Sequence, residues 1–123
     1  MGCVLVIEDE GGIQQLMQRI ISRMGHEVDQ ALSGPQALEH ARARAYDIIL
    51  TDFTLPGEPT GVDLVQALRE LQPRARMAVI TGLADTSRAQ ALHELGVTHI
   101  LRKPFDLSDL KQLVTELASP APG

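Results

Sequence analysis

Aromatic residues are scarce in this chain of 123 residues, which contains no tryptophan, one tyrosine and two phenylalanines. The core must therefore be built from Leu, Ile, Val, Ala and Met, which suit helices packed on a small apolar sheet. A surface that stacks successive nucleic-acid bases on aromatic rings is disfavoured for the same reason. The single cysteine, Cys3, excludes an internal disulfide.

An excess of basic charge and long hydrophobic runs are also lacking. Eleven Lys and Arg residues against sixteen Asp and Glu residues give a formal net charge of −5, and the sequence has no basic cluster. We therefore expect no direct binding to nucleic acid. No apolar run approaches the roughly 20 residues that span a bilayer, and the first residues lead into a strand pattern rather than a signal peptide. We expect no membrane insertion and a cytoplasmic protein.

The length and the hydrophobic content of 44% suit one globular domain and are too small for two domains of ordinary size. The last five residues, SPAPG, are typical of a linker or a frayed end. We expect one domain over residues 1–118, followed by a tail or linker at residues 119–123.

Five short apolar runs predict β-strands. They lie at residues 3–7, 27–31, 47–51, 76–80 and 97–101, and the second run is the weakest. Apolar residues at successive positions are typical of parallel strands that are covered on both faces. Segments of helical period lie between the runs, and this strict alternation predicts a doubly wound α/β fold. We expect a flavodoxin-like (βα)5 parallel sheet with strand order 2-1-3-4-5.

The clearest helical pattern follows the first strand. Its apolar residues recur at the spacing of one buried stripe, and Gly25 follows as a natural C′ residue. The stripe consists of Ile13, Leu16, Met17, Ile20, Ile21 and Met24. The last helix is expected to begin with Asp106 or Ser108 as its N-cap.

Polar side chains follow the predicted strands, at the sheet edge where open α/β folds bind ligands. They are Glu8 and Asp9 after the first strand, Asp52 after the third, Thr81 after the fourth, and Lys103-Pro104 after the fifth. Because the carboxyl ends of parallel strands share one edge of the sheet, we expect these side chains to converge on one site.

Three carboxylates that converge repel one another, so the site needs positive charge. A hard divalent cation that prefers oxygen ligands, Mg²⁺ above all, suits Glu8, Asp9 and Asp52 together with a backbone carbonyl. The cation and the Lys103 ammonium would let a phosphoryl group approach Asp52 as the nucleophile, while Thr81 donates a hydrogen bond to it. The residues therefore predict an acyl phosphate on Asp52.

These motifs resemble the receiver domain of bacterial response regulators in two-component signalling. The resemblance rests on the acidic pair of VIEDE at 6–10, the aspartate of ILTDFTLP at 49–56, the threonine of VITG at 79–82 and the lysine of LRKPF at 101–105. The resemblance covers residues 3–118. Each motif is weak by itself, but four of them occur in the right order, each at the end of a predicted strand, and together they make a strong signal.

The resemblance implies a phosphoacceptor and a metal site. Asp52 would take a phosphoryl group from a histidine kinase or a phosphotransfer protein. Asp9 would bind Mg²⁺ directly, and Glu8 would act through water or more weakly. The backbone carbonyl of Thr54 would complete the metal shell, in which Mn²⁺ is an expected substitute for Mg²⁺. Such a protein is a signalling domain rather than an enzyme, because it catalyses only its own phosphorylation and dephosphorylation.

The resemblance also implies a conformational switch. Lys103 would contact the phosphoryl oxygens and would be joined to Pro104 by a cis peptide bond. Thr81 would move toward the phosphate and reshape the face made by the fourth helix, the fifth strand and the fifth helix. A phosphorylation-dependent homodimer is a further expectation from the family.

Three features depart from the family pattern. Ile100 occupies the position three residues before the lysine, where relatives often carry an aromatic switch residue. The loop at residues 55–61 is slightly enlarged and rich in turn formers. Leu83 lacks a polar group that could orient an attacking water, which predicts slow loss of the phosphoryl group.

Other functions remain open at the level of sequence. Asp52-Phe53-Thr54 superficially resembles the nucleophile loop of aspartyl-phosphate-type phosphatases, but it follows the third predicted strand rather than the first, and no substrate cap is evident. A flavodoxin-like nucleotide binder would need a glycine-rich loop where Glu8-Asp9-Glu10 stands. A phosphorylation-independent, receiver-like binding module is a third alternative. The residues also have plainer interpretations, as helix caps, turn residues or a solvated lysine.

Overall fold

The computed structural model describes residues 2–82 and 86–118, without the side chains of residues 86–88. Five strands alternate with five helices along the chain. The strands are β1 (Cys3–Ile7), β2 (Glu27–Ala31), β3 (Ile48–Asp52), β4 (Arg76–Thr81) and β5 (Val97–Arg102). The helices are α1 (Gly11–Arg23), α2 (Gly34–Ala43), α3 (Gly61–Leu71), α4 (Thr86–Glu94) and α5 (Leu107–Ala118). Leu83 and the expected tail at 119–123 lie outside the described residues.

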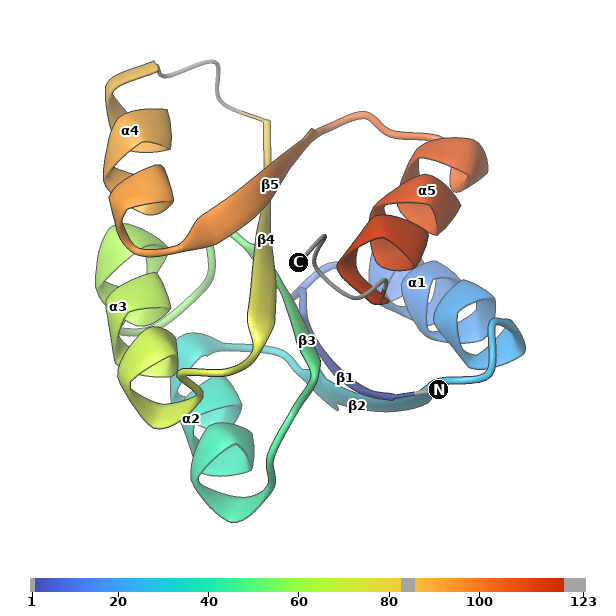
Figure 1. Cartoon of the computed structure of the whole chain (residues 1–123), viewed down its shortest axis with the longest axis horizontal. Helices are drawn as coiled ribbons and strands as arrows, with labels where there is room; N and C mark the ends of the chain where they lie inside the picture. The colour runs from blue at the N-terminus through green and yellow to red at the C-terminus, as the bar shows by residue number, and fades with distance from the viewer. Residues whose placement is uncertain (1, 83–85, 119–123) are drawn as a thin grey trace, which may run out of the picture.

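The strands form one parallel sheet in the order β2-β1-β3-β4-β5 (Figure 1). The predicted doubly wound, flavodoxin-like architecture and its strand order are therefore confirmed. The order reverses at β1, because the chain moves outward to β2 and then returns past β1 to β3. This reversal is a topological switch point, where ligands of such sheets bind at the carboxyl ends of the strands.

Two helical layers cover the sheet, with α1 and α5 on one face and α2, α3 and α4 on the other (Figure 1). The central strands are apolar at successive positions because both of their faces are buried. In β1, Val4 and Val6 pack in the cluster formed with α1 and α5, whereas Leu5 and Ile7 pack in the cluster on the opposite face. The core is thus divided by the sheet into two apolar layers.

Helix α1 differs from its predicted stripe at one position. Leu16 is 38% exposed, whereas Met17, Ile20 and Ile21 are buried as expected. The buried polar residue Gln14 lies on the same face instead, because its amide nitrogen donates to the carbonyl oxygens at the ends of β1 and β2. The expectation that Leu16 belongs to the core was therefore wrong.

The predicted helix ends are present. Gly25, immediately beyond the C-cap of α1, has a φ of 95°, a backbone conformation that glycine adopts without strain. At the start of α5, the Asp106 carboxylate accepts a hydrogen bond from the Asp109 backbone N–H, and Asp109 returns the same interaction to the Asp106 N–H. Asp106 is therefore the N-cap of α5, in a reciprocal arrangement that satisfies two backbone donors.

The loop that joins β3 to α3 lies against the start of α2. A Cβ atom placed on Gly34 would lie 1.9 Å from the Pro59 carbonyl oxygen, so only glycine permits this approach. Pro35 lies on the other side of the contact, 3.4 Å from the Cβ position of Gly57. The α2 N-terminus therefore supports the loop that follows Asp52 in the chain. No helix within residues 2–82 and 86–118 has the length and apolar character to cross a membrane.

Candidate functional site

The carboxyl edge of the sheet brings together residues from three strand ends. Glu8 follows β1, Asp52 is the last residue of β3, and Lys103 follows β5. Lys103 Nζ lies 2.9 Å from Asp52 Oδ2 and 3.2 Å from Glu8 Oε2. Ligand oxygens of Glu8, Asp9 and Asp52 lie within 4.8 Å of one another. The edge therefore carries three negative charges and one positive charge in a small volume.

The two acidic residues after β1 have different surroundings because the backbone turns between them. The Glu8 N–H donates to the Ala31 carbonyl, which continues the β1–β2 hydrogen bonding by one residue and directs the Glu8 side chain into the protein. Glu8 is completely buried, whereas Asp9 is exposed. Helix α1 has Glu10 as its N-cap, without a side-chain cap hydrogen bond. The plainer interpretation of Glu8 and Asp9 as helix caps therefore finds no support.

Glu8 is an unfavourable place for a negative charge. Burial raises the pKa of its carboxyl group, and the nearby Asp52 carboxylate raises it further. Hydrogen bonds from the Glu10 N–H and from Lys103 to Oε1 act in the opposite direction without cancelling the increase. Oε2 is buried and has no hydrogen-bond partner among the described residues, although Lys103 Nζ lies at ion-pair distance from it. This oxygen is available to a further cation.

Lys103 is held against the carboxylates by the backbone of neighbouring strands. Its N–H donates to the Thr81 carbonyl at 2.9 Å, and its peptide bond to Pro104 is cis. Burial alone lowers the pKa of the Lys103 ammonium, but the hydrogen bond and charge of Asp52, together with Glu8, outweigh burial and raise it. Lys103 is therefore a fixed positive charge at neutral pH.

The other residues named from the sequence lie around this centre. Thr81 is the half-buried last residue of β4, and Thr54 is exposed two residues beyond Asp52. The Thr54 N–H donates to Asp52 Oδ1 at 3.2 Å, which orients the carboxylate. Ile100 is 40% exposed in β5, the edge strand on the α4 side.

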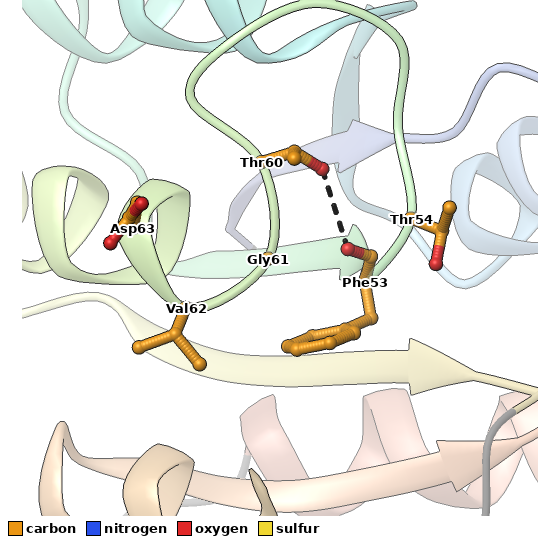
Figure 2. Close-up of a pocket in the computed structure, with 6 residues that line it drawn as sticks. All are labelled: Phe53, Thr54, Thr60, Gly61, Val62 and Asp63. Carbon is orange, nitrogen blue, oxygen red and sulfur yellow. Dashed lines mark hydrogen bonds between the residues drawn. The ribbon is translucent and has the colours of Figure 1, made fainter.

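A shallow hollow of about 360 Å³ lies between the β3–α3 loop and the first turn of α3 (Figure 2). It is lined by Phe53, Thr54, Thr60, Gly61, Val62 and Asp63. Gly61 has a φ of 58°, and a Cβ atom there would lie 3.5 Å from the Phe53 ring. Thr60 donates a hydrogen bond to the Phe53 carbonyl across the mouth of the loop (Figure 2).

The donor set suits a hard divalent cation. Three carboxylates supply only oxygen ligands, and Glu8 Oε2 is a buried oxygen without a hydrogen bond among the described residues. One ammonium does not balance three carboxylates, so a second cation lowers the repulsion between them. The part of the site that is exposed, at Asp9, leaves room for the water ligands that Mg²⁺ retains.

Two contributors to the site were missed from the sequence. Gln14 is anchored to the Glu8 carbonyl at 3.1 Å, and Thr60 makes hydrogen bonds on both sides of Thr54. A glutamine inside an apolar helical stripe could have indicated such a contact, because a buried amide needs hydrogen-bond partners. Thr60 gave no such signal, since a threonine before a helix is normally read as its N-cap.

The fold and the site together define a class of α/β domain, with a parallel (βα)5 sheet and an acidic cluster paired with a lysine at its carboxyl edge. The response regulator receiver domain matches residues 4–115 of the sequence. The chain therefore belongs to the response regulator receiver domain family, which acts in two-component signalling.

Three known proteins illustrate the similarity. Sporulation initiation phosphotransferase F of Bacillus subtilis is 26% identical over 111 residues, which are 90% of this chain and 89% of the relative. Response regulator protein PilR of Pseudomonas aeruginosa is 32% identical over 89% of this chain, which spans only 24% of that longer protein. A crystal structure of a response regulator from Burkholderia pseudomallei, with a phosphorylated aspartic acid, a calcium ion and citrate, superposes with a TM-score of 0.80. It is 29% identical, and the match covers 99% of this chain and 76% of that chain.

Proposed function

We propose that the protein receives a phosphoryl group on Asp52 from a histidine kinase or a phosphotransfer protein, in a reaction that depends on Mg²⁺. The observation that carries this proposal is the cluster at the sheet edge, in which Lys103 Nζ contacts Asp52 while Glu8 and Asp9 offer oxygens within 4.8 Å. The phosphorylated aspartic acid and calcium ion of the similar Burkholderia pseudomallei structure support it. The domain would comprise residues 1–118.

Asp52 would act as the nucleophile. One carboxylate oxygen attacks phosphorus, the phosphorus–nitrogen bond of the phosphohistidine breaks, and the imidazole nitrogen keeps the electron pair. The product is an acyl phosphate on Asp52. The hydrogen bond from the Thr54 N–H to Oδ1 holds the carboxylate in one orientation, and Oδ2 contacts Lys103. Lys103 can transfer its contact from Asp52 to the incoming phosphoryl oxygens, which also carry negative charge.

Glu8, Asp9 and Asp52 would hold the metal ion, with the Thr54 carbonyl as a further oxygen ligand. The bound Mg²⁺ supplies positive charge that offsets the charge of the phosphoryl oxygens. Mn²⁺ prefers similar oxygen ligands and is expected to substitute. Glu8, which is buried and costly to ionise, gains a counter-charge in this state.

Thr81 would respond to phosphorylation from the end of β4. Its hydroxyl can donate to a phosphoryl oxygen on Asp52, since the two residues end neighbouring strands. Movement of Thr81 would alter the face formed by α4, β5 and α5, where a downstream partner would bind. Ile100 occupies the position of the usual aromatic switch residue, so repacking of an aliphatic side chain would replace the rotation of a ring.

The test is incubation with Mg²⁺ and acetyl phosphate, followed by intact-mass analysis. We expect one phosphoryl adduct on the wild-type protein that is absent with EDTA and absent in Asp52→Ala. Asp47→Ala is the matched control, because Asp47 lies at the opposite end of β3 and should leave the adduct unchanged. An adduct that persists in Asp52→Ala would overturn the proposal. Catalytic turnover of a small phosphate ester, without a stoichiometric adduct, would instead favour a phosphatase.

A further inference from the structure

Thr60 bridges the two residues that flank Thr54. Its hydroxyl accepts a hydrogen bond from the Leu55 N–H at 3.1 Å and donates one to the Phe53 carbonyl at 3.4 Å. Figure 2 shows the second of these, reaching from the start of α3 back to the end of the strand. One hydroxyl therefore closes the loop from both sides, five to seven residues away in the chain.

The side chain makes these contacts instead of the one that its position predicts. Thr60 is the N-cap residue of α3, with extended backbone angles, yet its side chain makes no cap hydrogen bond. An N-cap hydroxyl ordinarily accepts from a backbone N–H in the first turn of its own helix. At this position the helix gives up that stabilisation, and the hydroxyl serves the loop beside Asp52.

Contacts other than those of Thr60 hold the residues next to Thr54 only in part. The Phe53 N–H donates to the Ile80 carbonyl, so the loop is tied to β4 on the side nearest the strand. The side chains of Phe53 and Leu55 are both buried, whereas Thr54 is exposed between them. With its two neighbours held by Thr60, the main chain of Thr54 has little freedom to rotate.

We propose that Thr60 is a positioning residue for the metal site, which sets the main chain of Thr54 so that its carbonyl can serve as a ligand. The inference rests on the proposed function, in which that carbonyl completes the metal shell. A threonine that closes the loop in the metal-free protein removes the need to order the loop during binding. Thr60 therefore determines the affinity for Mg²⁺ and leaves the chemistry of Asp52 to other residues.

The test compares Thr60→Val, which keeps the shape and loses the hydroxyl, with Thr60→Ser, which keeps the hydroxyl. Calorimetric titration with Mg²⁺ should give a dissociation constant that is roughly five- to tenfold weaker for Thr60→Val and close to wild type for Thr60→Ser. At saturating Mg²⁺, the rate of phosphorylation by acetyl phosphate should return to the wild-type value. Thr115→Val, which removes a hydroxyl from the exposed side of α5, is the matched control.

Distinct results would contradict the inference and the proposed function. A Thr60→Val variant that melts at a lower temperature yet binds Mg²⁺ like wild type would reduce Thr60 to a structural role and overturn the inference. Failure of the wild-type protein to bind Mg²⁺ and become phosphorylated would instead remove the proposed function. If Thr60→Val does not fold, hydrogen exchange of the wild type decides the question. The Leu55 N–H should be protected without metal, and exchange as fast as in a free peptide would refute the inference.

Discussion

Lys103 Nζ lies 2.9 Å from Asp52 Oδ2, although 51 residues separate the two in the chain. The contact joins the end of β3 to the residue that follows β5, with β4 between them in the sheet. The same ammonium reaches Glu8 from the end of β1. Lys103 is thus the internal counter-ion of the acidic cluster. Its ammonium supplies part of the positive charge that a bound metal ion would otherwise provide.

Replacement of Lys103 is expected to separate metal binding from phosphorylation. Lys103→Met removes the ammonium that contacts Asp52 and Glu8, so the affinity for Mg²⁺ should rise by roughly tenfold. Phosphorylation at saturating Mg²⁺ should be slower, because the phosphoryl oxygens lose a positive contact. Titration calorimetry and the rate of adduct formation measure the two effects. Weaker Mg²⁺ binding in this variant would show that Lys103 organises the ligands instead of competing with the metal.

Glu8 predicts a dependence of stability on pH. The pKa of its carboxyl group is raised in the folded protein from the ordinary value of 4.5, which applies to the unfolded chain. At a pH between the unfolded and the folded pKa, the folded state therefore holds a proton that the unfolded chain releases. Stability contributed by the protonated form is therefore present below about pH 4.5 and is lost as the pH rises through the folded pKa. At neutral pH without metal, Glu8→Gln should melt at a higher temperature than the wild type.

Metal should reverse the order of the two proteins. Saturating Mg²⁺ stabilises the wild type by mass action, whereas Glu8→Gln lacks one ligand and should gain less. Melting curves with EDTA and with Mg²⁺, recorded from acid to neutral pH, give both comparisons. Equal melting temperatures for the two proteins in EDTA at every pH would contradict the inference that ionisation of the buried Glu8 carboxyl group destabilises the metal-free protein.

Gly34 is expected to be essential for the support of the β3–α3 loop. In Gly34→Ala the new methyl group would meet the Pro59 carbonyl at 1.9 Å, so the loop must move, at an expected cost of about 1–3 kcal/mol. Mg²⁺ binding should weaken together with stability, because the displaced loop contains Thr54. Gly12→Ala is the control, since the same methyl group in α1 meets nothing within 4 Å and should be neutral or stabilising.

Arg69 should contribute to stability through its hydrogen bonds to backbone carbonyls. Its guanidinium donates to four carbonyl oxygens at the ends of α3 and α4 and before β4, with donor–acceptor distances of 2.8–3.2 Å. Arg69→Leu should lower the free energy of unfolding by about 1–3 kcal/mol, because these carbonyls lose a charged donor. Chemical denaturation measures the change, with Arg19→Leu on the exposed side of α1 as the control. If Arg69→Leu and Arg19→Leu change the free energy of unfolding equally, the four Arg69 contacts contribute nothing to stability.

The fold was predictable because its signals are local and repeated. Each predicted strand agrees with the structure to within one residue at either end. The third strand was predicted to begin at Asp47 but begins at Ile48. The other differences occur where polar residues continue a ladder, since Asp52 pairs with Ile80 and Thr81 pairs with Arg102. A polar side chain at the end of an apolar run does not reveal whether its backbone is still hydrogen-bonded as a strand.

The convergence of the acidic residues and the lysine on one edge was predictable, and their internal arrangement was less so. Parallel strands bring Glu8, Asp52 and Lys103 to one edge whatever the details of packing. Glu8 is completely buried beside the exposed Asp9, and its N–H donates to the Ala31 carbonyl, a contact between distant segments that no local sequence pattern encodes. The roles of Thr60 and Gly34 depend on contacts between segments, which only the folded chain reveals.

The order of the strands along the chain has a consequence for biosynthesis. The acidic residues precede β4, whereas the lysine that pairs with Glu8 and Asp52 follows β5. Until the ribosome has added the segment after β5, the chain carries the carboxylates of Glu8, Asp9 and Asp52 without the Lys103 ammonium. The internal counter-ion of the acidic cluster is therefore the last of these four charged residues to be synthesised.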